Sequence, residues 1–351
     1  MADEAESVDK GRVGGVPVAD WRRLYDVATR LRALDPWQWM TLGHLFGAQL
    51  HGASEPAFVL FSRPGESARR MVTVFPGWRA FRIAFANNAA ADNRPPLEKT
   101  VEESWLRLLF VPREGLARTD RTVLARLGLP AGDAGEFPVF YSQRVGYYPD
   151  RPNAAEVAGL REILYQAYGM AMRIETDSGL TQERLPQTFF VRVQDAAGRW
   201  RDAWVDEPPL SGEGIDVSLD LTRVRRIAGF SGEGGVLQVD LVLTPLRAKT
   251  RGSRRAEAVF TLLLMDRGTR EIVCCEALQA LEGIDAMWAR VPGIMLREIE
   301  QLGVLPAEIE VCSERMLNVL RPLSEMLPFK LRRREKLTAL EGVRASLAEL
   351  L

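Results

Sequence analysis

VFTLLLMDRGTREIVCCEAL, residues 259–278, contains two apolar runs that are separated by a short polar segment. Short apolar runs bounded by turn residues are typical of buried strands, so we predict a β-hairpin here. Asp266 then has two interpretations. It either caps the turn with its side chain, while Gly268 takes a positive φ, or it is the metal-holding carboxylate of a nuclease-type site. Since Asp-x-Gly is a common turn sequence, we expect the turn.

Outward from this hairpin, the chain from residue 236 to residue 351 alternates between strand and helix patterns. The predicted strands are 236–246, 256–265, 270–278, 307–312 and 328–333, and the predicted helices are 284–303, 313–327 and 335–351. This order, β-β-β-α-β-α-β-α, resembles that of the ribonuclease H-like fold. The resemblance implies an α/β domain with a mixed sheet and a carboxylate-rich metal site at its central strands.

An active member of that fold would carry acids on the first strand, the first helix, the end of the fourth strand and the last helix. The chemistry needs them because two magnesium ions clamp the attacking and leaving oxygens of a phosphodiester. Asp240 on the first strand fits this pattern. The fourth strand instead ends in Cys312 and Ser313, and Glu314 follows just inside the next helix.

The positions on the first and last helices fit the pattern of metal-binding acids less well. Glu298 and Glu300 lie beside the apolar stripe of the first helix, and we expect both in water. Glu341 lies beside the stripe of the last helix, and we expect the same of it. A lone Asp240 does not hold two divalent ions, so the sequence predicts a module without working metal ligands.

Two basic stretches are candidate phosphate contacts. RAKTRGSRR, residues 247–255, has five positive charges and no acid, and KLRRREK occupies residues 330–336. The alternative interpretation is a solvated loop and an edge strand that is protected by charge against aggregation. Seventeen basic and sixteen acidic residues between 236 and 351 leave this region almost neutral, which weakens the nucleic-acid interpretation. The candidate contacts are Arg247, Lys249, Arg251, Arg254 and Arg255.

Residues 18–228 carry helix and strand patterns that predict an α+β domain. An amphipathic helix at its start ends before Pro36, and Trp37 and Trp39 follow. These two aromatic side chains are either a stacking platform for a base or sugar ring, as in a small-molecule sensor, or core anchors. We favour the core, because aromatic residues bury large areas there. A hairpin is predicted at 186–206, and whether it closes this domain stays open.

The remaining segments are read as flexible. Residues 1–17 begin with an acidic, polar stretch and are predicted to be disordered. GFSGEGG, residues 229–235, is rich in glycine and is the predicted linker. The second domain then covers residues 236–351.

Composition limits the classes of function. The formal net charge of −1 provides no global field that would attract nucleic acid or an acidic membrane. The only histidines, His44 and His51, lack the spacing of metal ligands. Three cysteines give no disulfide framework, and no signal sequence or membrane-length apolar run is present. We therefore predict a cytoplasmic protein that has no membrane partner.

Longer segments resemble a bacterial family of two-part proteins of unknown function. The resemblance is carried by WRRLYDVATRLRALDPWQWM and FPVFYSQRVGYYPDRPNAAEVAGLREIL in the first half and by DRGTREIV and PAEIEVCSERMLNVLRPL in the second. It implies the two-domain organisation and no assigned activity.

Two hypotheses follow. The first is a non-enzymatic interaction or regulatory protein that has a protein partner, no cofactor and a degenerate ribonuclease H-like module. The alternative is a divergent nuclease or nucleic-acid-binding protein that uses Mg²⁺ or Mn²⁺ at Asp240, Glu314 and Asp266.

Overall fold

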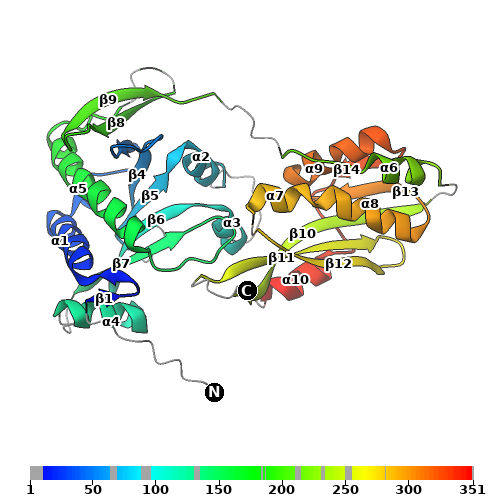
Figure 1. Cartoon of the computed structure of the whole chain (residues 1–351), viewed down its shortest axis with the longest axis horizontal. Coiled ribbons are helices and arrows are strands. Elements are labelled where there is room, and N and C mark those ends of the chain that lie inside the picture. The colour runs from blue at the N-terminus through cyan, green and yellow to red at the C-terminus, as the bar shows by residue number, and fades with distance from the viewer. Residues whose placement is uncertain are drawn as a thin grey trace. The chain divides into compact units, whose positions relative to one another are not determined.

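The computed structural model describes residues 11–63, 69–87, 96–129, 135–182, 185, 187–209, 215–230, 234–249, 255–280 and 282–349. The chain divides into two compact units (Figure 1). The first contains Met1–Asp92, Glu103–Gln143 and Pro149–Pro209, and the second contains Asn93–Glu102, Arg144–Tyr148 and Leu210–Leu351. Each unit combines helices with a mixed sheet, which the sequence predicted for the second unit.

The division falls earlier in the chain than the predicted linker at 229–235. Helix α6, Leu221–Ala228, belongs to the second unit. Its apolar side chains Val224 and Ile227 are buried in the core of that unit, because the helix is strongly amphipathic. Residues 231–233 of the predicted linker lie outside the described residues, and strand β10 already begins at Gly234.

The sheet of the first unit has seven strands in the order β7-β6-β5-β4-β3-β8-β9. The strands are β3 Phe46–Gln49, β4 Ala57–Ser62, β5 Met71–Pro76, β6 Trp105–Pro112, β7 Glu136–Gln143, β8 Thr188–Gln194 and β9 Trp200–Asp206. Neighbours are antiparallel except for β3 and β8, which are parallel. The pair β8–β9 is the hairpin that was predicted at 186–206, and it lies in the first unit.

Helices cover both faces of this sheet. Helices α1, Val18–Leu34, and α5, Ala154–Thr176, share one core with the sheet, and α2, Gly77–Asn87, packs on Phe58 and Phe75 of the other face. Helix α5 begins with a capping box in which the Asn153 side chain accepts a hydrogen bond from the Glu156 backbone at 2.9 Å. The shorter helices are η1 Pro36–Gln38, η2 Arg113–Gly115 and α4 Arg118–Leu127.

Part of the segment that was predicted to be disordered is ordered. Strands β1, Arg12–Val13, and β2, Val16–Pro17, pair antiparallel just before α1. Glycines at 14 and 15 have positive φ, which allows the tight turn between them. Residues 1–10 lie outside the described residues.

The sheet of the second unit has five strands in the order β12-β11-β10-β13-β14. They are β10 Gly234–Ala248, β11 Glu257–Asp266, β12 Ile272–Gln279, β13 Pro306–Val311 and β14 Lys330–Arg333. β10 and β12 each run antiparallel to β11, whereas β13 runs parallel to β10 and β14 parallel to β13. The sheet is therefore mixed, as expected.

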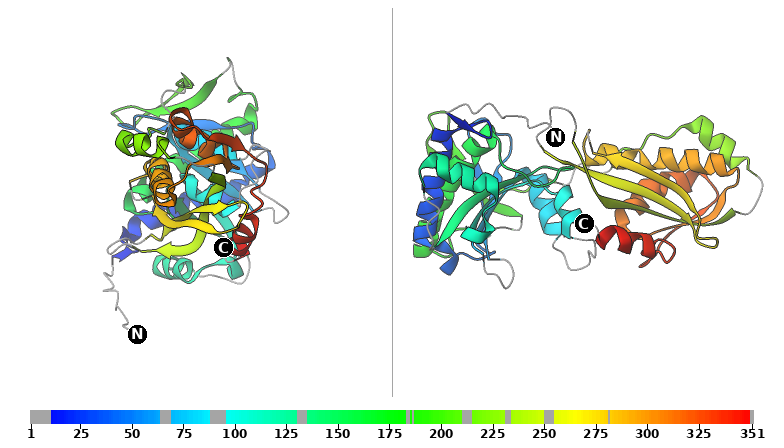
Figure 2. Two further views of the ribbon diagram at one scale, coloured as in Figure 1. Left: turned by 90° about the vertical axis from the view of Figure 1, so that its right-hand side faces the viewer. Right: turned by 90° about the horizontal axis from the view of Figure 1, so that it is seen from below.

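The alternation of side chains along β10 separates the two faces of this sheet. Val239 and Leu241 point into a large core with α8, Val291–Leu302, and α9, Glu314–Met326. Val242 points to the opposite face, where it meets the segment that leads into α10. Figures 1 and 2 show α8 and α9 on one side of the sheet and α10 on the other. The remaining helices are α3 Pro96–Glu102, α7 Ile284–Ala289 and α10 Glu341–Glu349.

One predicted helix is divided in two. The expected helix at 284–303 is interrupted at Arg290, and Pro292 lies in the first turn of α8. Proline has no backbone N–H to donate, so it is tolerated at the start of a helix and ends the preceding one. No helix in the described part of the chain is both long enough and apolar enough to cross a lipid bilayer.

Candidate functional site

The α10 face of the second sheet holds a buried carboxylate. Asp240 of β10 is only 4% exposed. Its Oδ1 accepts a hydrogen bond from the Leu241 backbone at 3.0 Å, and its Oδ2 forms an ion pair with Arg344 of α10. The Sγ of Cys312, which directly follows β13, lies 3.6 Å from the same Oδ2. Asp240 therefore already has a cationic partner from its own chain.

Burial and charge set the protonation of this group. Burial raises the pKa of Asp240, although the Arg344 guanidinium acts in the opposite direction. Burial and the Asp240 charge raise the pKa of the Cys312 thiol to about 11. Burial lowers the pKa of Arg344, but the neighbouring Asp240 carboxylate and Cys312 sulfur more than offset it, so its pKa is raised. The arrangement is a guanidinium shared between a carboxylate and a neutral thiol, with Arg344 3.2 Å from the Cys312 Sγ.

A second buried acid, Glu310, lies beside this group. Its Oε2 accepts a hydrogen bond from the Gln238 side chain at 2.8 Å, and its Oε1 accepts from Arg267 and Arg334, each at 2.8 Å. The backbone of Ala339 donates in turn to the Gln238 side chain at 2.8 Å. Burial alone would raise the pKa of Glu310, but these hydrogen bonds and arginine charges hold it below its ordinary value.

These residues do not fit a pair of magnesium ions. Mg²⁺ requires oxygen ligands in near-octahedral geometry, and a thiol such as that of Cys312 is not among them. Arg344 neutralises Asp240, and Arg267 and Arg334 neutralise Glu310. Divalent ions at this face would therefore have to displace arginine side chains that the fold itself supplies.

The other two carboxylate candidates are not brought to Asp240. Glu314 is exposed at the start of α9 and pairs with Arg333 at 3.1 Å. Asp266 ends β11, and its Oδ1 accepts hydrogen bonds from the backbones of Gly268 and Thr269, each at 2.8 Å. This is the predicted turn. Gly268, however, does not take the positive φ, because Arg270 adopts it with φ 62°.

Several of the described residues in the two basic stretches contact other groups of the protein. Arg247 is exposed and lies over the Tyr148 ring at 4.5 Å, and Lys249 is exposed. Arg255 is buried, with 9% exposure, while Arg251 and Arg254 lie outside the described residues. The second stretch is paired with acids. Its ion pairs are Arg332–Glu308, Arg333–Glu314, Arg334–Glu308 and Arg334–Glu310.

The two tryptophans of the proposed platform are core residues. The Trp37 ring packs edge-on against Phe61 and Phe110, with centroid distances of 5.5 Å in both cases. Its Nε1 donates to the Met71 carbonyl at 3.0 Å, and the Trp39 Nε1 donates to the Ala171 carbonyl at 3.0 Å. Trp37 is 6% exposed, whereas Trp39 is half-buried against the same core.

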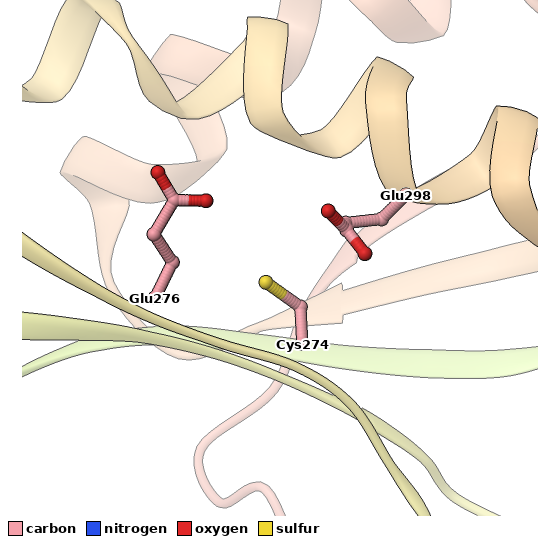
Figure 3. Close-up of side chains that lie close together, drawn as sticks. All are labelled: Cys274, Glu276 and Glu298. Carbon is pink, nitrogen blue, oxygen red and sulfur yellow. The ribbon is translucent and has the colours of Figure 1, made fainter.

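A different cluster, which sequence reasoning missed, lies on the opposite face of the second sheet. Cys274 and Glu276 are two residues apart on β12 and therefore lie on the same face of the sheet. Glu298 of α8 faces them (Figure 3). The Sγ and one carboxylate oxygen from each glutamate lie within 4.8 Å of one another. Glu298 is 8% exposed, so the expectation that it faces water is wrong. Glu300 is half-buried and pairs with Arg223 at 2.8 Å.

Arg297 is the cation nearest this cluster. It forms an ion pair with Glu276, and its Nε donates to Glu298 at 2.8 Å. Burial, together with the charges of Glu298 and Glu276, raises the pKa of the Cys274 thiol to about 11. The sequence signal was present in the i, i+2 spacing of Cys274 and Glu276, but the partner helix could not be placed from sequence.

The fold and this polar interior define a mixed α/β protein of two units without an assigned activity. Residues 21–192 match the family described as Domain of unknown function (DUF7309), and residues 223–348 match Domain of unknown function (DUF6930). The chain is thus a two-domain protein that combines these domains of unknown function, as the resemblance implied. No curated protein matches the chain.

Proposed function

We propose that the chain is a non-enzymatic interaction or regulatory protein whose second unit is a degenerate ribonuclease H-like module. The observation that carries the proposal is the ion pair between Asp240 and Arg344. A carboxylate that an active module would offer to a metal is here neutralised by the last helix of the same unit. The carboxylate then serves the packing of α10 on the sheet.

The topology of the second unit supports the ribonuclease H-like part of the proposal. Three antiparallel strands are followed by two strands parallel to the first, in the spatial order β12-β11-β10-β13-β14. Helices connect β12 to β13 and β13 to β14, and a helix closes the chain. This is the element order that the strand and helix patterns of residues 236–351 predict.

The other positions of the metal site support the loss of activity. Cys312 stands at the end of β13, where the fold family has an aspartate, and its thiol pKa of about 11 keeps it protonated at neutral pH. Glu298 of the first helix contacts Arg297 on the face opposite Asp240. Glu341 of α10 is exposed and pairs with Lys336 at 3.6 Å.

One hollow on the second unit suits a protein partner better than a nucleic acid. A hollow of about 160 Å³ beside the start of β10 is bordered by the exposed apolar side chains Leu302 and Val304. The charged residues that line it are Asp266 and Glu271, so phosphate groups would be repelled there. Three free cysteines agree with a reducing compartment, and we place the protein in the cytoplasm.

The proposal is tested by incubating the purified chain with single-stranded DNA, RNA and an RNA–DNA hybrid in the presence of Mg²⁺ or Mn²⁺. We expect no cleavage above that of the Asp240→Asn variant. Binding to these nucleic acids should be weak, and the double variant Arg247→Gln, Lys249→Gln should not change its salt dependence. Cleavage by the wild type that is lost in Asp240→Asn would favour the nuclease alternative.

A further inference from the structure

The cluster of Cys274, Glu276 and Glu298 has the donor set of a metal site of another kind. One thiol and two carboxylates converge from a strand and a helix, with their ligand atoms within 4.8 Å of one another. A thiolate together with carboxylates suits borderline divalent ions such as Zn²⁺, whereas Mg²⁺ and Ca²⁺ take oxygen ligands only. Three protein ligands leave the fourth tetrahedral position to water or a substrate.

The Cys274 thiol provides an independent indication of a ligand. Its residue is 8% exposed, and within the described part of the chain no hydrogen-bond partner is found for its Sγ. Figure 3 shows the sulfur on the side of β12 that faces α8, directed toward the two carboxylate groups.

We propose that Cys274, Glu276 and Glu298 bind one divalent transition-metal ion of the Zn²⁺ class, with Arg297 as the cation that holds the carboxylates together in the metal-free protein. Arg297 is 40% exposed in its side chain, so its guanidinium can turn into solvent when a doubly charged ion enters. Metal binding ionises the thiol, and the proton of Cys274 passes to the buffer.

The site is independent of the non-enzymatic role proposed above. Cys274 and Asp240 lie on opposite faces of the sheet, because the cross-strand partner of Cys274 is Leu264 and that of Asp240 is Leu263, which are consecutive on β11. Loss of one site therefore leaves the ligands of the other in place, and a failed test here does not bear on the ion pair at Asp240.

Cobalt provides the direct readout, since Co²⁺ bound by a thiolate has a near-ultraviolet charge-transfer band and tetrahedral Co²⁺ has strong visible bands. We expect saturable growth of both bands at one equivalent in the wild type and their loss on addition of Zn²⁺, which binds more tightly than Co²⁺. Titration calorimetry in two buffers of different ionisation enthalpy should report release of about one proton at neutral pH.

The chain provides matched variants. Cys274→Ser should abolish the charge-transfer band, whereas Cys275→Ser, which changes the exposed neighbour on the opposite face, should retain it. Glu298→Gln should weaken Co²⁺ binding at least about tenfold, and Arg297→Gln should retain or strengthen it by removing the competing cation. The unfolding transition of each variant is recorded as a control for folding.

Absence of the band in the folded wild type would overturn the proposal. A band that persists in Cys274→Ser would overturn it as well, because the thiolate would then belong to another cysteine. If Cys274→Ser does not fold, the decision falls to the Glu298→Gln and Arg297→Gln variants. Equal Co²⁺ affinity in Glu298→Gln and the wild type would contradict the site. A loss of Co²⁺ affinity in Arg297→Gln would also contradict it, because the cluster would then be a structural ion pair that needs Arg297.

Discussion

Asp240 of β10 and Arg344 of α10 form an ion pair across 104 positions of the chain, on the face of the second sheet that α10 covers. The Asp240 side chain is 6% exposed, and that of Arg344 is 30% exposed. Breaking such a pair leaves a buried charge without compensation, which is strongly unfavourable. The pair therefore attaches α10 to the sheet, and under the proposed function it also keeps the Asp240 carboxylate from binding a metal.

Removal of the Arg344 charge should destabilise the protein. Arg344→Met keeps an apolar stem of similar length but leaves the Asp240 carboxylate buried and unpaired. We expect a loss of about 3 kcal/mol in the free energy of unfolding, near the lower end for broken buried pairs because Arg344 is partly exposed. Urea unfolding of the wild type and the variant measures it.

The reverse deletion should be milder. Asp240→Asn leaves the Arg344 guanidinium, which can reach solvent, so we expect a smaller loss than in Arg344→Met. In the double variant the two losses should not add, because both remove the same interaction. Glu341→Gln on the exposed side of α10 is the control. Equal losses in all three single variants would show that the pair has no special role.

Glu310 should make the stability depend on pH. Its pKa is below the ordinary value of 4.5 because hydrogen bonds from Gln238 and Arg334, and the charge of Arg267, outweigh burial. A carboxylate with a lowered pKa contributes stability above its unfolded-state pKa and loses it as the pH falls through the folded-state pKa. The wild type should thus exceed Glu310→Gln in stability at neutral pH, and the difference should shrink as the pH falls below 4.5. A difference that does not change with pH would contradict this assignment.

The three cysteines should differ in reactivity. Cys275 is exposed, whereas burial raises the pKa values of Cys274 and Cys312 to about 11. At pH 8 only about one in a thousand molecules of such a thiol is ionised, so alkylation of folded protein should modify Cys275 first. Mass spectrometry of the labelled peptides checks this, and Cys275→Ser should label very slowly. Rapid modification of Cys274 in that variant would contradict its buried environment.

Local patterns in the sequence are sufficient to predict much of the second unit. The hairpin around Asp266 is predictable because two apolar runs flank a turn sequence, and strand and helix order follow from periodicity alone. Positive φ at Arg270 instead of Gly268 is not predictable, because the backbone of the turn depends on the register of β11 and β12. Pro292 signals the division of the helix before it, but the continuous apolar stripe favours a single helix.

Long-range contacts account for what sequence patterns miss. Glu298 lies one position from the apolar residue Ile299, and only the edge strand β12, with Cys274 and Glu276, explains why it is buried. Helix α6 was assigned to the wrong side of the predicted linker because an amphipathic helix does not reveal from sequence which core it joins. The pairing of Asp240 with Arg344 could not be predicted for the same reason, because the sequence around Arg344 indicates only a charged residue on a terminal helix.

A calorimetric titration of Mn²⁺ into the folded wild type and into Asp240→Asn tests most directly whether Asp240 is lost to metal chemistry. The ion pair with Arg344 predicts that the two titrations are the same, so that any heat of Mn²⁺ binding does not depend on Asp240. Saturable binding in the wild type that disappears in Asp240→Asn would contradict the proposed function. In that case the carboxylate would be a metal ligand, and the second unit would have to be treated as a working metal-dependent module.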